Sequence, residues 1–108
     1  MLRSTGAAIL FAVAAVAAAV AAPAPPRQHT VVVEGMAFTP STLSVKRGDR
    51  IVWVNRDLVP HTATARDRSF DSGRIAAGAA WSRVAVRRGR FAYDCTYHPT
   101  MTGTLVVE

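Results

Sequence analysis

The chain has 108 residues, a length that fits one domain, and 13 basic against 7 acidic residues give it a formal charge of +6. A basic surface favours acidic protein partners or an anionic membrane. Nucleic acid is a poor partner for this chain, because its arginines are scattered without an aromatic platform. A single cysteine excludes an internal disulfide.

The N-terminal residues predict a secretory signal peptide over residues 1–21. Arg3 precedes an uncharged run rich in Ala and Val, and small residues near its end fit a cleavage site. An uncleaved anchor is the alternative, but the run is short and weakly apolar for a span of ~20 residues. A Pro/Ala linker follows over residues 22–29, and the domain proper is expected over residues 30–108, exported or periplasmic.

The remainder of the chain consists of short β-rich runs separated by turn residues. Strands are expected over residues 30–34, 42–46, 50–55, 61–65, 81–86, 91–95 and 104–108. No segment after the signal shows a helical period. This pattern predicts an all-β fold, a small Greek-key antiparallel β-sandwich.

One compact cluster near the C-terminus carries the chemistry. Cys95, His98 and Met101 are separated by two residues each, and His61 lies upstream. Two imidazoles, a thiolate and a thioether favour copper over magnesium or calcium. A long axial Met bond disfavours a closed tetrahedral zinc site, although zinc could occupy the three stronger donors.

Two motifs give the chain a resemblance to a known family. Residues 54–61, VNRDLVPH, resemble the first-histidine motif of the cupredoxins, which are type I blue copper proteins. Residues 93–104, YDCTYHPTMTGT, resemble the C-terminal ligand loop of the same family. The resemblance covers residues 30–108 and is closest to the amicyanins, with pseudoazurins and plastocyanins as near relatives.

The resemblance implies a single type I copper ion and assigns a role to each matching residue. His61, Cys95 and His98 would form the trigonal ligand set, and Met101 would be the axial ligand. Asn55 matches a family asparagine whose hydrogen bonds tie the two ligand segments together near the sulfur.

The resemblance also implies an electron port at the surface. The ring edge of His98 would lie in an apolar patch, and Pro99, Pro60, Met36 and Tyr97 are expected around it. Tyr97 is a departure, because some relatives carry proline or a small residue at this position. The bulky ring could alter the patch without changing the ligand spacing.

These expectations describe an exported one-electron shuttle that is not an enzyme. It would be a monomer that docks transiently on a redox donor and acceptor, such as a dehydrogenase, a cytochrome or a terminal reductase. No nucleic acid partner and no stable membrane insertion after cleavage are expected. A periplasmic copper carrier or resistance protein is one alternative, and an immunoglobulin-like binding module without metal is another.

Overall fold

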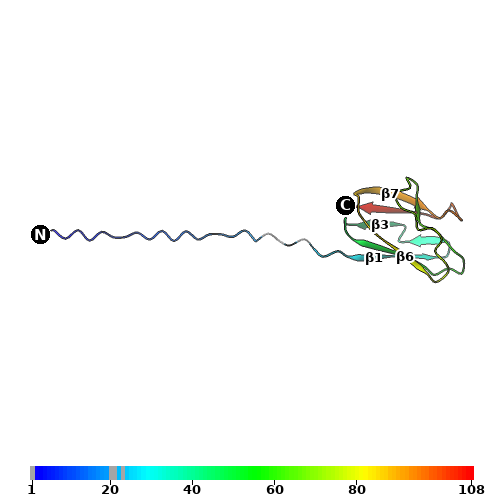
Figure 1. The fold of residues 1–108 in the computed structure, drawn as a ribbon, viewed down its shortest axis with the longest axis horizontal. Helices are drawn as coiled ribbons and strands as arrows, with labels where there is room; N and C mark the ends of the chain where they lie inside the picture. The colour runs from blue at the N-terminus through cyan, green and yellow to red at the C-terminus, as the bar shows by residue number, and fades with distance from the viewer. Residues whose placement is uncertain (1, 20–21, 23) are drawn as a thin grey trace.

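The computed structural model describes residues 2–19, 22 and 24–108, and its strands form two facing sheets (Figure 1). The strands are β1 (Gln28–Glu34), β2 (Ala37–Thr39), β3 (Thr42–Val45), β4 (Arg50–Asn55), β5 (Thr64–Ala65), β6 (Ala80–Val84), β7 (Gly89–Asp94) and β8 (Thr102–Val107). Residues 1, 20, 21 and 23, which include the expected cleavage region and part of the expected linker, lie outside the described residues.

The N-terminal segment stands apart from the sandwich. Residues 2–19 are exposed, contain neither helix nor strand, and extend away from the sheets (Figure 1). Within the described part of the chain, no helix is long and apolar enough to cross a membrane.

The two sheets confirm the predicted all-β sandwich, but their strands are mixed in direction. The strand orders are β2-β1-β4-β6 and β3-β8-β7-β5. The β1–β4 and β3–β8 pairs are parallel, so the expectation of a purely antiparallel sandwich is corrected. The chain reaches β4 only after β3 has joined the other sheet, and such a crossover returns a strand in the parallel direction.

Strand β1 begins two residues earlier than expected. Gln28 and His29, assigned above to the linker, pair with Arg50 and Ile51 of β4. The His29 ring also reaches the Asp49 carboxylate, with 2.9 Å between Nε2 and Oδ2. Polar residues can occupy the start of β1 because their partners lie on β4 and in the turn before it, and composition alone does not reveal these contacts.

Alternating side chains from both sheets fill the core. Phe91, Tyr93 and Cys95 are all buried, as the predicted alternation requires, although Cys95 lies one residue beyond β7. The Tyr93 ring packs edge-on against Trp53 of the facing sheet, with 5.7 Å between ring centroids. The core therefore holds the end of β7 firmly and directs the thiol of Cys95 inward.

Gly103 in β8 lies against the same tyrosine. A Cβ atom added at Gly103 would overlap the ring of Tyr93, so only glycine fits here without movement of a buried side chain. This close approach fixes the position of Gly103, the second residue of β8, two residues after Met101.

Candidate metal centre

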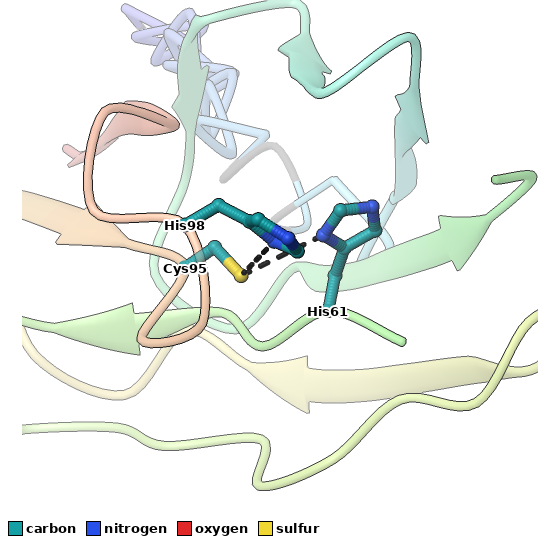
Figure 2. A group of neighbouring side chains, drawn as sticks. All are labelled: His61, Cys95 and His98. Atoms are coloured by element: carbon teal, nitrogen blue, oxygen red, sulfur yellow. Dashed lines mark hydrogen bonds between the residues drawn. The ribbon is translucent and has the colours of Figure 1, made fainter. Parts of the chain in front are cut away.

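Three donor side chains converge at the end of the sandwich where β7 passes into β8. The donor atoms of His61, Cys95 and His98 all lie within 4.8 Å of one another (Figure 2). The Cys95 Sγ atom is 3.6 Å from Nδ1 of each histidine. Within the described residues, this is the single group of three or more such donors that could hold a metal ion.

The loop from Cys95 to Met101 is closed by its own backbone. The N–H of Cys95 donates to the carbonyl of Met101 at 3.1 Å. The N–H of His98 donates to the Cys95 carbonyl at 3.2 Å, and the N–H of Met101 donates to the His98 carbonyl at 2.9 Å. The two-residue spacings therefore form one tight turn that brings Met101, itself buried, back beside Cys95.

His61 enters the site from the connection between β4 and β5. Its backbone forms an isolated bridge with Ile75, with N–H to carbonyl distances of 3.1 and 2.8 Å. Its ring is fully buried, and Nε2 lies 2.7 Å from Oδ2 of Asp57. An ionised carboxylate can only accept, so Nε2 carries a proton, and in the neutral ring the lone pair is then on Nδ1, the atom nearest the Cys95 sulfur.

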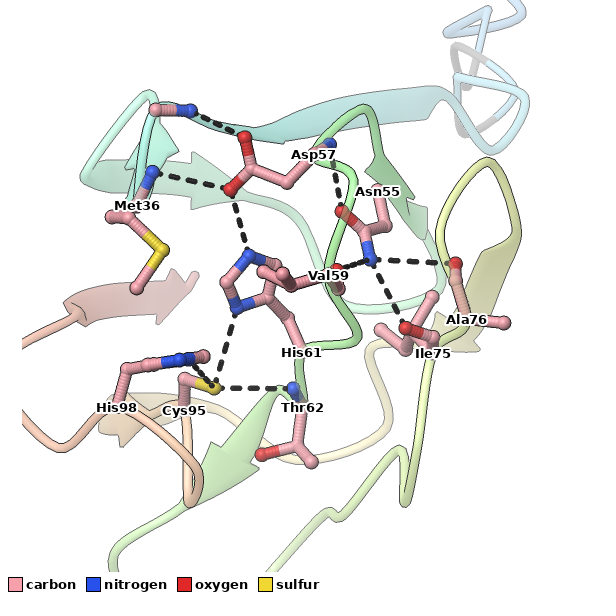
Figure 3. Close-up of polar contacts among 11 residues, drawn as sticks. Met36, Asn55, Asp57, Val59, His61, Thr62, Ile75, Ala76, Cys95 and His98 are labelled. Atoms are coloured by element: carbon pink, nitrogen blue, oxygen red, sulfur yellow. Dashed lines mark hydrogen bonds and ion pairs between the residues drawn. The ribbon is translucent and has the colours of Figure 1, made fainter.

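Asp57 is a residue that sequence reasoning missed. Besides His61, its carboxylate accepts the N–H of Gly35 at 2.7 Å and the N–H of Met36 at 3.1 Å (Figure 3). Burial tends to raise the pKa of Asp57, but the hydrogen bonds from Gly35, His61 and Met36 outweigh it, so its pKa lies below the ordinary value. The carboxylate thus stays charged and ties the β1–β2 turn to the His61 ring. The sequence feature that could have identified Asp57 is its position four residues before the candidate ligand His61.

Asn55 supports the segment that carries His61. Its buried side chain donates to the carbonyls of Val59 at 2.9 Å and Ile75 at 3.0 Å, and accepts the N–H of Asp57 at 2.9 Å. A third carbonyl, that of Ala76, lies at 3.3 Å (Figure 3). These contacts all lie on the His61 side and do not connect the two ligand segments.

Thr62 makes that connection instead. Its Oγ1 accepts the N–H of Thr96 at 2.8 Å and lies 3.2 Å from the Thr96 hydroxyl. Its backbone N–H points at the Cys95 sulfur, 3.4 Å away. The position directly after His61 was the available signal, but a threonine in a strand has many ordinary roles.

The surface above the cluster is rich in apolar side chains. His98 is partly buried, and Met36, Leu58, Val59 and Tyr97 are exposed on loops at this end of the sandwich. Pro99 is exposed as well, whereas Pro60 is only partly so. Leu58, almost wholly exposed, and Val59 were not among the expected patch residues. We refer to Met36, Leu58, Val59, Tyr97 and Pro99 as the apolar rim.

The chemistry of this donor set fits copper. A thiol, a thioether and two imidazoles combine soft and borderline donors, which bind copper well and leave magnesium and calcium weakly held. His61, Cys95, His98 and Met101 are thus arranged as a potential copper site.

Comparison with known proteins agrees with this site. The amicyanin of Paracoccus denitrificans is 31% identical over 78 residues, which cover 68% of this chain and 60% of that protein's length. The amicyanin of Paracoccus versutus is 28% identical over 93 residues, covering 82% of this chain and 70% of that protein.

Solved structures show the same fold. A methionine-to-alanine variant of amicyanin in its Cu(I) form has a TM-score of 0.70 and 29% identity, covering 75% of this chain and 82% of that one. A purple cupredoxin from Nitrosopumilus maritimus, at 22% identity, has a TM-score of 0.69 and covers 74% of this chain and 99% of that one. The sequence profile described as a cupredoxin-like domain matches residues 6–107, so the chain belongs to the cupredoxin-like family.

Proposed function

We propose that this protein is an exported blue copper protein that carries one electron at a time between redox partners. His61, Cys95 and His98 would be the strong ligands, and Met101 the weak axial ligand. The observation that carries the proposal is the convergence of the three donor atoms within 4.8 Å from two segments far apart in the sequence. The amicyanin relatives and the Cu(I) amicyanin structure support it.

The residues around the cluster would hold the ligands still while the charge changes. A bound copper ion supplies a couple between Cu(II) and Cu(I). Asp57 fixes the orientation and tautomer of His61, and Thr62 connects the His61 segment to the Cys95 loop. Such contacts outside the ligand set orient ligands and tune the metal.

The partly exposed ring of His98 would be the site through which the electron passes to a docked partner. The apolar rim is exposed at the same end of the sandwich, and a partner could cover its side chains without desolvating charges. An interface made of these few side chains would be small, and small redox interfaces are weak and short-lived, as a shuttle requires. We propose a monomer that docks on one redox protein to receive the electron and on another to deliver it, in the periplasm.

Rapid-mixing kinetics tests the shuttle against a copper carrier. The copper-loaded full chain is reduced and mixed with an excess of an oxidised cytochrome. A shuttle is oxidised quickly and repeatedly and keeps its copper. Slow oxidation together with ready loss of copper to a competing chelator would instead identify a carrier.

A pair of variants locates the docking surface in the same assay. Leu58→Glu places a charge on the apolar rim, and Val86→Glu places the same charge on an exposed valine outside it. We expect the first variant to slow oxidation severalfold and the second to leave the rate nearly unchanged. Equal slowing by both variants would contradict the assignment of the rim.

A further inference from the structure

The end of the sandwich opposite the candidate metal centre has a different surface. Here four exposed basic side chains, those of Arg27, Lys46, Arg47 and Arg88, line one hollow together with Pro25 and Pro26. We refer to these four basic residues as the basic end. They come from the segment before β1, from the β3–β4 turn and from the β6–β7 turn, so the fold assembles the patch from three places in the chain.

Basic side chains outnumber acidic ones at this end. Asp49 is buried, and its carboxylate is engaged by the N–H groups of Arg27 and Lys46, each at 3.0 Å, and by the His29 ring. The remaining carboxylate of the hollow belongs to Glu108. Four basic side chains therefore face solvent here, against the buried carboxylate of Asp49 and the exposed Glu108.

The apolar N-terminal segment joins the sandwich at this same end. The chain enters β1 beside the C-terminus, whereas the β7–β8 loop with the donor cluster lies at the far end (Figure 1). Pro25 and Pro26, which line the hollow, lead back toward the Ala- and Val-rich run. An apolar run followed by a cluster of basic residues is a combination that attracts anionic lipid surfaces.

We propose that the basic end is a docking surface for an anionic lipid membrane. Bound in this way, the domain would lie on the headgroups by the basic end, and the apolar rim would point away from the membrane toward soluble partners. The position of the apolar run favours a lipid surface over an acidic protein, for a chain that keeps this run as the uncleaved anchor considered above. The proposal does not depend on copper, so it can fail while the proposed function stands.

Vesicle binding of the full chain tests the proposal. The probes are vesicles of phosphatidylcholine alone and vesicles that also contain phosphatidylglycerol, and the measured quantity is the ratio of the two partition coefficients. The apolar run contributes to both coefficients and cancels in the ratio. We expect Arg47→Glu/Arg88→Glu to lower this ratio by more than ~25-fold, because each basic residue near an anionic surface contributes roughly a factor of five and each introduced glutamate adds repulsion.

The matched control is Arg56→Glu/Arg74→Glu, which changes the net charge equally at two exposed arginines that do not belong to the basic end. Its ratio should stay within about twofold of that of the unmodified chain. Thermal unfolding of each variant shows whether the fold is intact, and Arg47→Gln/Arg88→Gln should give an intermediate ratio. Equal losses in both Glu variants would overturn the proposal, and so would binding to an acidic polymer without a preference for anionic vesicles.

Discussion

Two histidine–carboxylate pairs lie at opposite ends of this sandwich and are built in the same way. Asp57 accepts two backbone N–H groups and the Nε2 of His61, with 2.7 Å between the side chains. Asp49 likewise accepts two backbone N–H groups and the Nε2 of His29, at 2.9 Å. At each end a carboxylate fastens neighbouring loops and orients one imidazole.

The pairs differ in what faces the other side of the ring. His61 is fully buried and has the sulfur of Cys95 3.6 Å from its Nδ1 atom. The side chain of His29 remains 23% exposed and is not part of the donor cluster. The same local arrangement thus serves the scaffold at one end and a candidate ligand at the other, and the Cys95 loop makes the difference.

Matched substitutions at the two carboxylates test this contrast most strongly. We expect Asp57→Asn to lower copper affinity about 10–100-fold, because loss of the charge frees the His61 ring to reorient. Asp49→Asn should lower the free energy of unfolding and leave copper affinity unchanged. Competition titration with a chelator measures the affinity. Equal affinities in the two variants would contradict the role given to Asp57.

Gly103→Ala tests how far the site depends on the core beneath it. The added methyl group would overlap the buried Tyr93 ring, and overpacking of this kind costs about 1–3 kcal/mol. Chemical unfolding measures the loss, with Thr102→Ala, at an exposed position of the same strand, as the control. If Gly103→Ala were no less stable than Thr102→Ala, the close packing against Tyr93 would be wrong.

Thr62→Val tests the connection between the two ligand segments. Valine keeps the shape but removes the acceptor of the Thr96 N–H, a loss of about 1–2 kcal/mol in the free energy of unfolding. Thr42→Val, at an exposed position of β3, should be close to neutral. Hydrogen exchange of the Thr96 amide should become faster in Thr62→Val alone, and unchanged exchange would argue against the connection.

Acid pH should produce the smallest effect on stability, and this effect should arise at the end of the sandwich that holds Asp49 and His29. Hydrogen bonds from the Arg27 N–H, the His29 ring and the Lys46 N–H lower the pKa of Asp49 from 3.8 to about 2. A lowered folded-state pKa stabilises the fold above the unfolded value, and this contribution disappears as pH falls from about 4 to about 2. Between about pH 4 and about pH 2, the free energy of unfolding should fall less steeply for Asp49→Asn than for the unmodified chain. Identical pH profiles would contradict the shift.

The sequence was enough to predict which donor side chains lie together, and less able to predict the residues that support them. Cys95, His98 and Met101 lie within one short loop, so their spacing is a local property. The contact between Thr62 and Thr96 joins residues 34 positions apart, and no sequence pattern around either residue predicts it.

The fold shows the same division between local and distant features. The apolar alternation of Phe91 and Tyr93 along β7 is local and predicted the inward face of that strand. The parallel pairing of β1 with β4 depends on which sheet the intervening strand joins, and alternation along one strand carries no information about that choice.

The most direct test of the central claim is the optical and electron paramagnetic resonance spectrum of the full chain loaded with copper. We predict one bound copper per chain and an intense blue absorption band in the oxidised form, which Cys95→Ser abolishes because the thiolate is its source. A copper-loaded chain without that band, or a band that persists unchanged in Cys95→Ser, would contradict the assignment of this site.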